Sequence, residues 1–224
     1  MAKQVDDHGS LLDLRILVNQ RQRLLDDQLI QSGHAASASI EWVSPLEPKS
    51  YAEYSDGKFL DAIGRPELRD ALSKFWPSGG PVWDGLGLGG DPGHAVFLLE
   101  AKAHLPELFS SGTGAGGPSL ELIRASMERV QHSLGVRSEM DWTGCFYQYA
   151  NRLAHLWWLR EQGVNAYLVY VYFLNDQSVS KPAPTSRAEW EAAFYVMRKC
   201  LGLTSHRLSS FVVDLYFDVN ELSP

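Results

Sequence analysis

An acid and a base end an apolar segment in the middle of the chain. Residues 95–99 are all apolar, and Glu100, Ala101 and Lys102 follow them directly. Such a run predicts a strand buried on both faces, and side-chain alternation places Glu100 and Lys102 on the same face. Each of these charges would lose its hydration at a high cost in free energy unless it pairs or binds a metal ion. The end of this strand is therefore the first candidate site.

A second acid is brought close by the expected turn. Residues 81–87 form a short strand pattern that contains Asp84, and the glycine-rich residues 87–93 join it to the apolar strand. Strands joined so closely are expected to form a hairpin, in which Asp84 comes beside Glu100. Two carboxylates suit Mg²⁺, which takes oxygen ligands and lowers the pKa of a bound water so that hydroxide can attack. Lys102 would orient that water or neutralise charge in the transition state.

This pattern resembles the PD-(D/E)xK nuclease family, whose fold is also called restriction-endonuclease-like. The resemblance rests on Asp84 in one strand of the hairpin and on Glu100-x-Lys102 at the end of the other. It covers the hairpin strongly and the order of elements from about residue 64 to the end loosely. One departure is that Trp83 precedes the aspartate, where the family pattern has a proline.

The resemblance implies an α/β fold, with an αβββαβ core whose mixed central sheet is flanked by helices. We expect one domain over 1–224, with a helical and irregular N-terminal extension over 1–63 and the core over 64–224. It also implies Mg²⁺ or Mn²⁺ held by Asp84, Glu100 and the Ala101 carbonyl, and hydrolysis of a nucleic-acid phosphodiester, with DNA expected as the substrate. Single-domain members of such a family often dimerise to cut two strands, which makes a homodimer one option, but no stretch of the sequence identifies an interface.

Other polar residues are candidates for the same site through this resemblance. The first core helix of such nucleases often contributes a further acid, and Glu67 is the candidate here, with Glu53 as a weaker alternative. Glu67 also fits a purely structural role, because acids favour the first turn of a helix. On the helix that follows the E-x-K strand, Gln148 or Arg152 would reach the scissile phosphate or the lysine. His155 lies among apolar residues and is expected to be a core histidine.

Two other motifs were weighed against this site. Glu47-Pro48-Lys49 has the same E-x-K spelling, but its proline removes a strand hydrogen bond and no buried strand precedes it. Residues 85–90 and 112–117 both spell G-x-G-x-x-G. Neither fits a dinucleotide fingerprint, which needs a strand directly before the glycines and an acid about 20 residues later. We interpret the first as a hairpin turn and the second as a loop able to close over substrate; a nucleotide-cofactor enzyme ranks lowest.

Composition bounds these hypotheses. The 224 residues carry a formal net charge of −7, which argues against a protein that coats nucleic acid through general basicity but allows a locally positive cleft. The acidic balance favours an alternative, in which the chain is a catalytically inactive binding or assembly module with a nuclease-like fold. Two distant cysteines, a polar N-terminus and no apolar run long enough to cross a bilayer predict a cytoplasmic protein without a membrane partner.

The remaining pattern predicts alternating helices and strands, typical of a mixed α/β sheet. Helices are expected over 10–31, 66–75, 119–134, 141–161 and 186–201, and strands over 39–43, 81–87, 94–100, 166–174 and 211–219.

Overall fold

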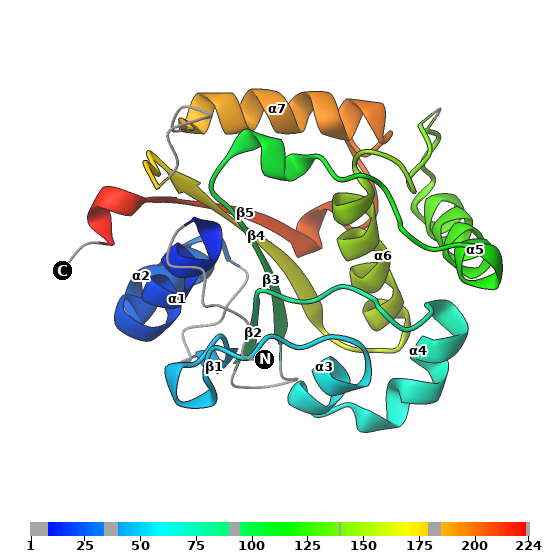
Figure 1. The fold of residues 1–224 in the computed structure, drawn as a ribbon, viewed down its shortest axis with the longest axis horizontal. Helices are drawn as coiled ribbons and strands as arrows, with labels where there is room; N and C mark the ends of the chain where they lie inside the picture. Colours follow the sequence, from blue (N-terminus) through cyan, green and yellow to red (C-terminus); the bar gives the residue numbers. More distant parts are fainter. Residues whose placement is uncertain (1–8, 34–39, 90–94, 139, 179–184, 223–224) are drawn as a thin grey trace.

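The chain folds around one mixed sheet of five strands. The computed structural model describes residues 9–33, 40–89, 95–138, 140–178 and 185–222. The strands are β1 (Ile40–Ser44), β2 (Gly85–Gly89), β3 (Val96–Lys102), β4 (Ala166–Leu174) and β5 (Val212–Asp218), and they lie side by side in this order (Figure 1). The first three pair antiparallel and the last three parallel, so the expected mixed α/β sheet is confirmed.

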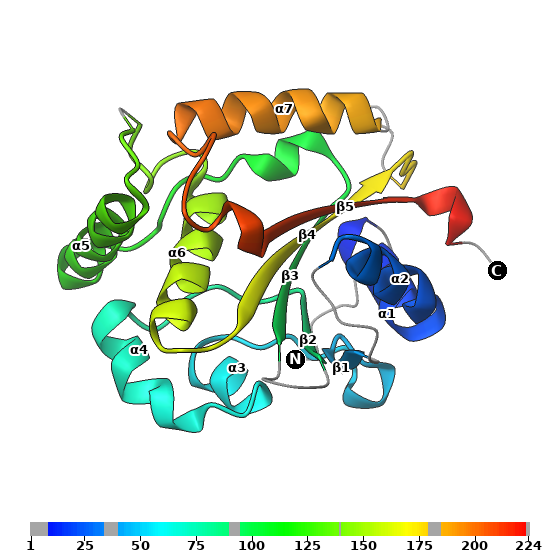
Figure 2. The same cartoon turned by 180° about the vertical axis from the view of Figure 1, so that it is seen from behind.

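Helices cover both faces of the sheet. One face carries α1 (Ser10–Gln20) and α2 (Gln22–Gln31), which pack on the apolar side chains of β3, β4 and β5. The other face carries α3 (Asp56–Ala62), α4 (Arg69–Phe75), α5 (Gly117–Leu134), α6 (Tyr147–Glu161) and α7 (Arg187–Cys200), as the two opposite views show (Figures 1 and 2). Short 3₁₀ turns lie at Glu47–Lys49, Pro66–Leu68, Leu105–Leu108, Ser209–Phe211 and Val219–Glu221.

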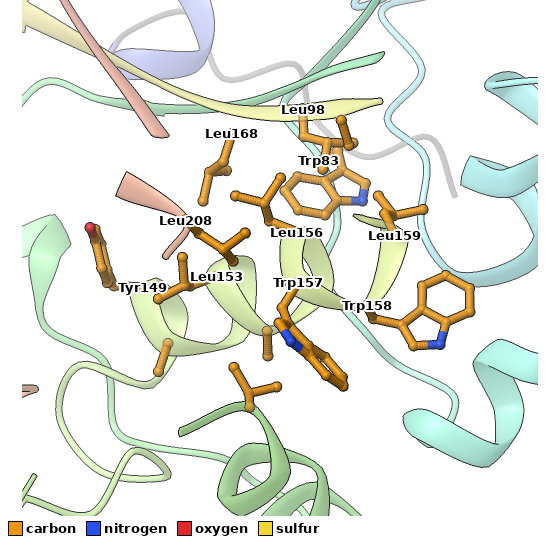
Figure 3. Close-up of a cluster of buried hydrophobic side chains, with 14 of the residues drawn as sticks. Trp83, Leu98, Tyr149, Leu153, Leu156, Trp157, Trp158, Leu159, Leu168 and Leu208 are labelled. Atoms are coloured by element: carbon orange, nitrogen blue, oxygen red, sulfur yellow. The ribbon is translucent and has the colours of Figure 1, made fainter. Parts of the chain in front are cut away.

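Helix α6 is the central helix of its face and follows α5 in the crossover from β3 to β4. Eleven of its residues are buried, so apolar side chains surround it on nearly all sides. Leu153 and Leu156 belong to the same cluster as Leu98 of β3 and Leu168 of β4 (Figure 3). Full burial of one such side chain contributes about 1.5–3 kcal/mol to the free energy of unfolding, so this cluster fixes α6 over the middle of the sheet.

The glycine-rich segment before the hairpin turn differs from the expectation. The strand expected over 81–87 is found at Gly85–Gly89 as β2, so glycines that were interpreted as a turn belong to the strand, and residues 90–94, which link β2 to β3, lie outside the described residues. Gly87 faces Trp42 of β1, and a Cβ on Gly87 would come within 2.9 Å of the Trp42 ring. A glycine-rich strand is disfavoured on average, but here the neighbouring tryptophan occupies the space that a side chain would need.

The N-terminal part of the chain belongs to the sheet. Strand β1 pairs with β2, and α1 and α2 cover one whole face, so a division at residue 63 does not separate an extension from the sheet. The helix expected over 10–31 is divided at Arg21, whose backbone leaves the helical conformation. Within the N-terminal segment, which was expected to be helical and irregular, Asp56–Ala62 forms α3. Among the described residues, no helix combines the length and apolarity needed to cross a membrane.

Polar contacts attach α1 to the residues that follow the C-terminal ends of β3 and β4. The Ser10 hydroxyl donates to Glu107 at 3.0 Å, and the other oxygen of Glu107 accepts two backbone amides that directly follow β3. Asp13, one turn further along α1, faces Glu107 and also Asp176, which follows β4. Burial and these two negative charges raise the pKa of Asp13 to about 7.

The raised pKa of Asp13 predicts a pH-dependent stability. The folded state keeps the proton that the unfolded state loses at about pH 4, so stability should fall as pH rises from about 4 to 7. Asp13→Asn should therefore resemble the wild type near pH 4 and be more stable above pH 7, as measured by urea unfolding across this range. Asp27→Asn, on the exposed side of α2, is the control. Parallel curves for wild type and Asp13→Asn would contradict the prediction.

Candidate functional site

The charged residues at the end of β3 are buried, as the sequence indicated. Every residue of β3 is buried, and the exposed fractions are 1% for Glu100 and 8% for Lys102. The strand lies between β2 and β4, and Glu100 points toward α6 on the face opposite to α1. A carboxylate at this depth requires compensation from nearby cations or hydrogen-bond donors.

Two cations compensate Glu100. The Lys102 ammonium lies 2.5 Å from one carboxylate oxygen, and Nε of Arg152, from α6, lies 2.6 Å from the other. Burial alone would raise the pKa of Glu100, but the charges of Arg152 and Lys102 outweigh burial and lower it. Glu100 is therefore ionised at neutral pH and held from two sides.

Arg152 also fixes the segment that precedes β2. Its guanidinium donates to the Val82 carbonyl at 2.9 Å and lies 5.2 Å from the centre of the Trp83 ring. Trp83 stands at the position where the family pattern has proline, and it is completely buried. The indole therefore supports Arg152 by a cation–π contact. Arg152 was expected to reach the scissile phosphate or the lysine, and its guanidinium contacts Glu100, the Val82 carbonyl and the Trp83 ring.

Asp84 lies beside the end of β3, as the hairpin predicted. Gly85 pairs with Leu99, and the Asp84 carboxylate accepts the Ala101 amide at 2.8 Å. The N–H and C=O of one strand residue point to the same side, so the Ala101 carbonyl also faces the Asp84 segment. Burial and the negative charge of Glu100 raise the pKa of Asp84 to about 7. Asp84 and Glu100 thus repel each other and would both gain from a cation between them.

A small cavity opens beside these residues. It is lined by Glu100, Lys102, Glu107, Leu108, Gln148, Tyr149 and Tyr170. Gln148 was expected at the site, and the structure places it in this lining on the first turn of α6. The tyrosines and Glu107 were not anticipated. Tyr170 lies in the middle of an apolar run, and only the register of β3 with β4 shows that it is the neighbour of Glu100.

The other predicted acids, Glu67 and Glu53, lie in different surroundings. Glu67 lies at the surface in the 3₁₀ turn before α4, where its carboxylate meets Arg65 at 2.5 Å. The hydrogen bond with Arg65 lowers the pKa of Glu67. Glu53 is half-buried and precedes Tyr54, which forms an antiparallel bridge with Trp83, the residue before Asp84.

The donor atoms at the end of β3 fit a magnesium-type ion. Mg²⁺ uses one or two carboxylates with waters and substrate phosphates, and Asp84, Glu100 and the Ala101 carbonyl are oxygen donors of this kind. Within the described ranges, no group of three or more histidine, cysteine, aspartate or glutamate side chains is arranged to hold a metal ion. The fit therefore rests on two carboxylates and requires Glu100 to share its oxygens with Lys102 and Arg152.

Comparisons of the chain with protein-family models, with curated proteins and with solved structures found no match.

Loss of Arg152 should destabilise the protein strongly. Arg152→Met leaves the buried Glu100 with one cation and frees the Val82 carbonyl, so we expect a loss of about 3–5 kcal/mol in the free energy of unfolding. Arg187→Met is the matched control, because Arg187 forms an exposed pair with Glu191 that is worth about 0.3–0.5 kcal/mol. Urea denaturation measures both. Similar losses for the two variants would show that Arg152 is not a central support of the site.

Proposed function

We propose that this protein is a divalent-metal-dependent nuclease that hydrolyses phosphodiester bonds of nucleic acid, with DNA as the preferred substrate. The observation that supports this most directly is the meeting of Asp84, Glu100 and Lys102 at the end of a buried strand. The cluster combines the oxygen donors for a metal with a cation for phosphate in one enclosed place. The same three residues carry the resemblance of the sequence to PD-(D/E)xK nucleases.

The order of elements supports the same proposal. If α3 and α4 between β1 and β2, and α5 before α6, are counted as insertions, the elements α1, α2, β1, β2, β3, α6 and β4 give an αβββαβ order. The three strands before α6 are antiparallel and β4 is parallel to β3. If the fold is restriction-endonuclease-like, its core therefore begins at α1 rather than near residue 64. The first core helix would then be α1, and not the segment that carries Glu67.

Asp84, Glu100 and the Ala101 carbonyl would hold the metal. When bound, a divalent cation supplies charge neutralisation at the phosphate and a more acidic water. The overall reaction adds water across a P–O bond and gives a phosphate monoester and an alcohol.

Lys102 has its own role in this reaction. Burial would lower the pKa of its ammonium, but Glu100 and Asp84 outweigh burial and raise it. Lys102 therefore stays charged and stabilises negative charge that develops on the phosphate oxygens. Gln148, which lines the cavity, would offer an amide to the substrate. These positive and polar groups give a local phosphate site on a chain that is acidic overall.

A second candidate function is an inactive binding or assembly module with the same fold. One observation favours it: both oxygens of Glu100 already bond to Lys102 and Arg152. A carboxylate neutralised in this way is stable without a metal, as a residual site would be. Titration calorimetry with Mn²⁺ separates the two functions, because the nuclease should bind the ion through Asp84 and Glu100 and the inactive module should not.

The nuclease function predicts metal-dependent cleavage that needs both charged residues of β3. Purified protein should cut DNA in Mg²⁺ or Mn²⁺, and Glu100→Gln and Lys102→Ala should each lower the rate at least about 100-fold. RNA is tested in parallel. Circular dichroism and thermal melting establish that each variant is folded before its rate is compared.

The chain provides its own control in Glu47-Pro48-Lys49, an exposed E-x-K with the same spelling. Glu47→Gln and Lys49→Ala should cleave like the wild type. Equal cleavage by all variants would assign the activity to a contaminant, and absence of cleavage by the wild type would reject the nuclease function.

A further inference from the structure

Three tyrosines stack side by side at the candidate site. Tyr149 of α6 lies on Tyr170 of β4, with 5.0 Å between ring centres and 7° between ring planes. Tyr170 lies in turn beside Tyr172, at 6.0 Å and 4°. All three rings are buried. Because the rings hold one another in place, the positions of their hydroxyl groups are also fixed.

The three hydroxyls differ in their hydrogen bonding. The Tyr149 hydroxyl accepts from Nε of Arg198 at 3.2 Å, and the Tyr172 hydroxyl donates to Asp214 at 3.3 Å. The Tyr170 hydroxyl has no hydrogen-bond partner among the described residues, although Tyr170 is only 3% exposed. A buried hydroxyl without a partner is unfavourable, and a phenylalanine would fill the same space at lower cost. Packing alone therefore does not explain why this position carries a hydroxyl, which points to a bound partner of the hydroxyl.

The position of Tyr170 supplies that explanation. In the parallel pairing of β3 with β4, Tyr170 is the register partner of Glu100, and both line the same cavity with Lys102 and Gln148. The cavity volume is about 10 Å³, which is close to what one water molecule needs. A buried water also needs two to four polar partners, and the lining provides a hydroxyl, a carboxylate, an ammonium and an amide.

We propose that Tyr170 holds one ordered water beside Glu100 and Lys102, and that this water attacks the phosphate in the proposed nuclease reaction. The second part rests on the proposed function, and the first part does not. Tyr170 contributes a hydrogen bond that fixes the water oxygen, while Lys102 and Glu100 provide further partners. The substrate phosphate would meet this water beside Lys102.

The hydroxyl is suited to this role by its chemistry as well as its position. Burial raises the pKa of Tyr170 far above its ordinary value, so the group remains a neutral hydroxyl at all working pH values. A neutral hydroxyl both donates and accepts hydrogen bonds, which allows it to orient a water without placing another charge beside Glu100.

The first experiment tests the water itself. Crystal structures of the wild type and of Tyr170→Phe, at a resolution that shows ordered water, should differ by one water within hydrogen-bond distance of the Tyr170 hydroxyl. Tyr172→Phe is the matched control, because it removes a neighbouring hydroxyl whose partner is Asp214, and it should keep the water. A wild-type map without water at Tyr170, or an unchanged water in Tyr170→Phe, would overturn the proposal.

The second experiment tests whether this water attacks. Tyr170→Phe should lower kcat about tenfold, the effect of losing one hydrogen bond, with KM and melting temperature unchanged. Tyr172→Phe should keep the wild-type kcat. An unchanged kcat in Tyr170→Phe of an active enzyme would overturn the attacking role. If the wild type itself does not cleave nucleic acid, the proposed function fails and the attacking role fails with it, while the maps still decide whether Tyr170 holds water.

Discussion

The burial of Glu100 is the constraint on which the site depends. Its carboxylate lies on a strand with both faces covered, and it stays ionised because Lys102 and Arg152 each bond to one of its oxygens. Arg152 comes from α6, whose apolar residues belong to the largest core cluster. Its ion pair with Glu100 therefore helps to position this helix against β3. The same guanidinium then reaches the segment that carries Asp84. Fold and site are thus stabilised by the same contacts.

Charge balance also connects the two candidate functions. Two acids and two bases meet at the end of β3, and burial together with the nearby charge of Glu100 raises the pKa of Asp84. A divalent ion between the acids would relieve this repulsion and compete with Lys102 and Arg152 for the oxygens of Glu100. In a nuclease, that competition would release Lys102 toward the phosphate. In an inactive module, Lys102 and Arg152 would remain bonded to Glu100 and no metal would replace them. The two functions therefore make opposite predictions for the binding of a divalent ion: the nuclease should bind it, and the inactive module should not.

Local patterns in the sequence predicted much of this arrangement. The apolar runs at 95–99 and 166–174 were recognised as buried strands, and the short link between 84 and 100 predicted the contact between Asp84 and the end of β3. Features that depend on packing were missed. Gly85–Gly89 forms a strand because Trp42 fills the space beside it, and α1 and α2 join the core through contacts distant in sequence. The place of Tyr170 at the site follows from the register of β3 with β4. The inward position of Arg152 follows from its ion pair with the buried Glu100.

The central claim is that Asp84 and Glu100 form a site for a divalent cation at the end of a buried strand. Crystals soaked in Mn²⁺ and measured for anomalous scattering test it most directly. The account predicts an anomalous peak between the two carboxylates, within bonding distance of both, with at least one oxygen of Glu100 released from Lys102 or Arg152. A map without a peak there, with Glu100 still bonded to both cations at a saturating Mn²⁺ concentration, would contradict the claim.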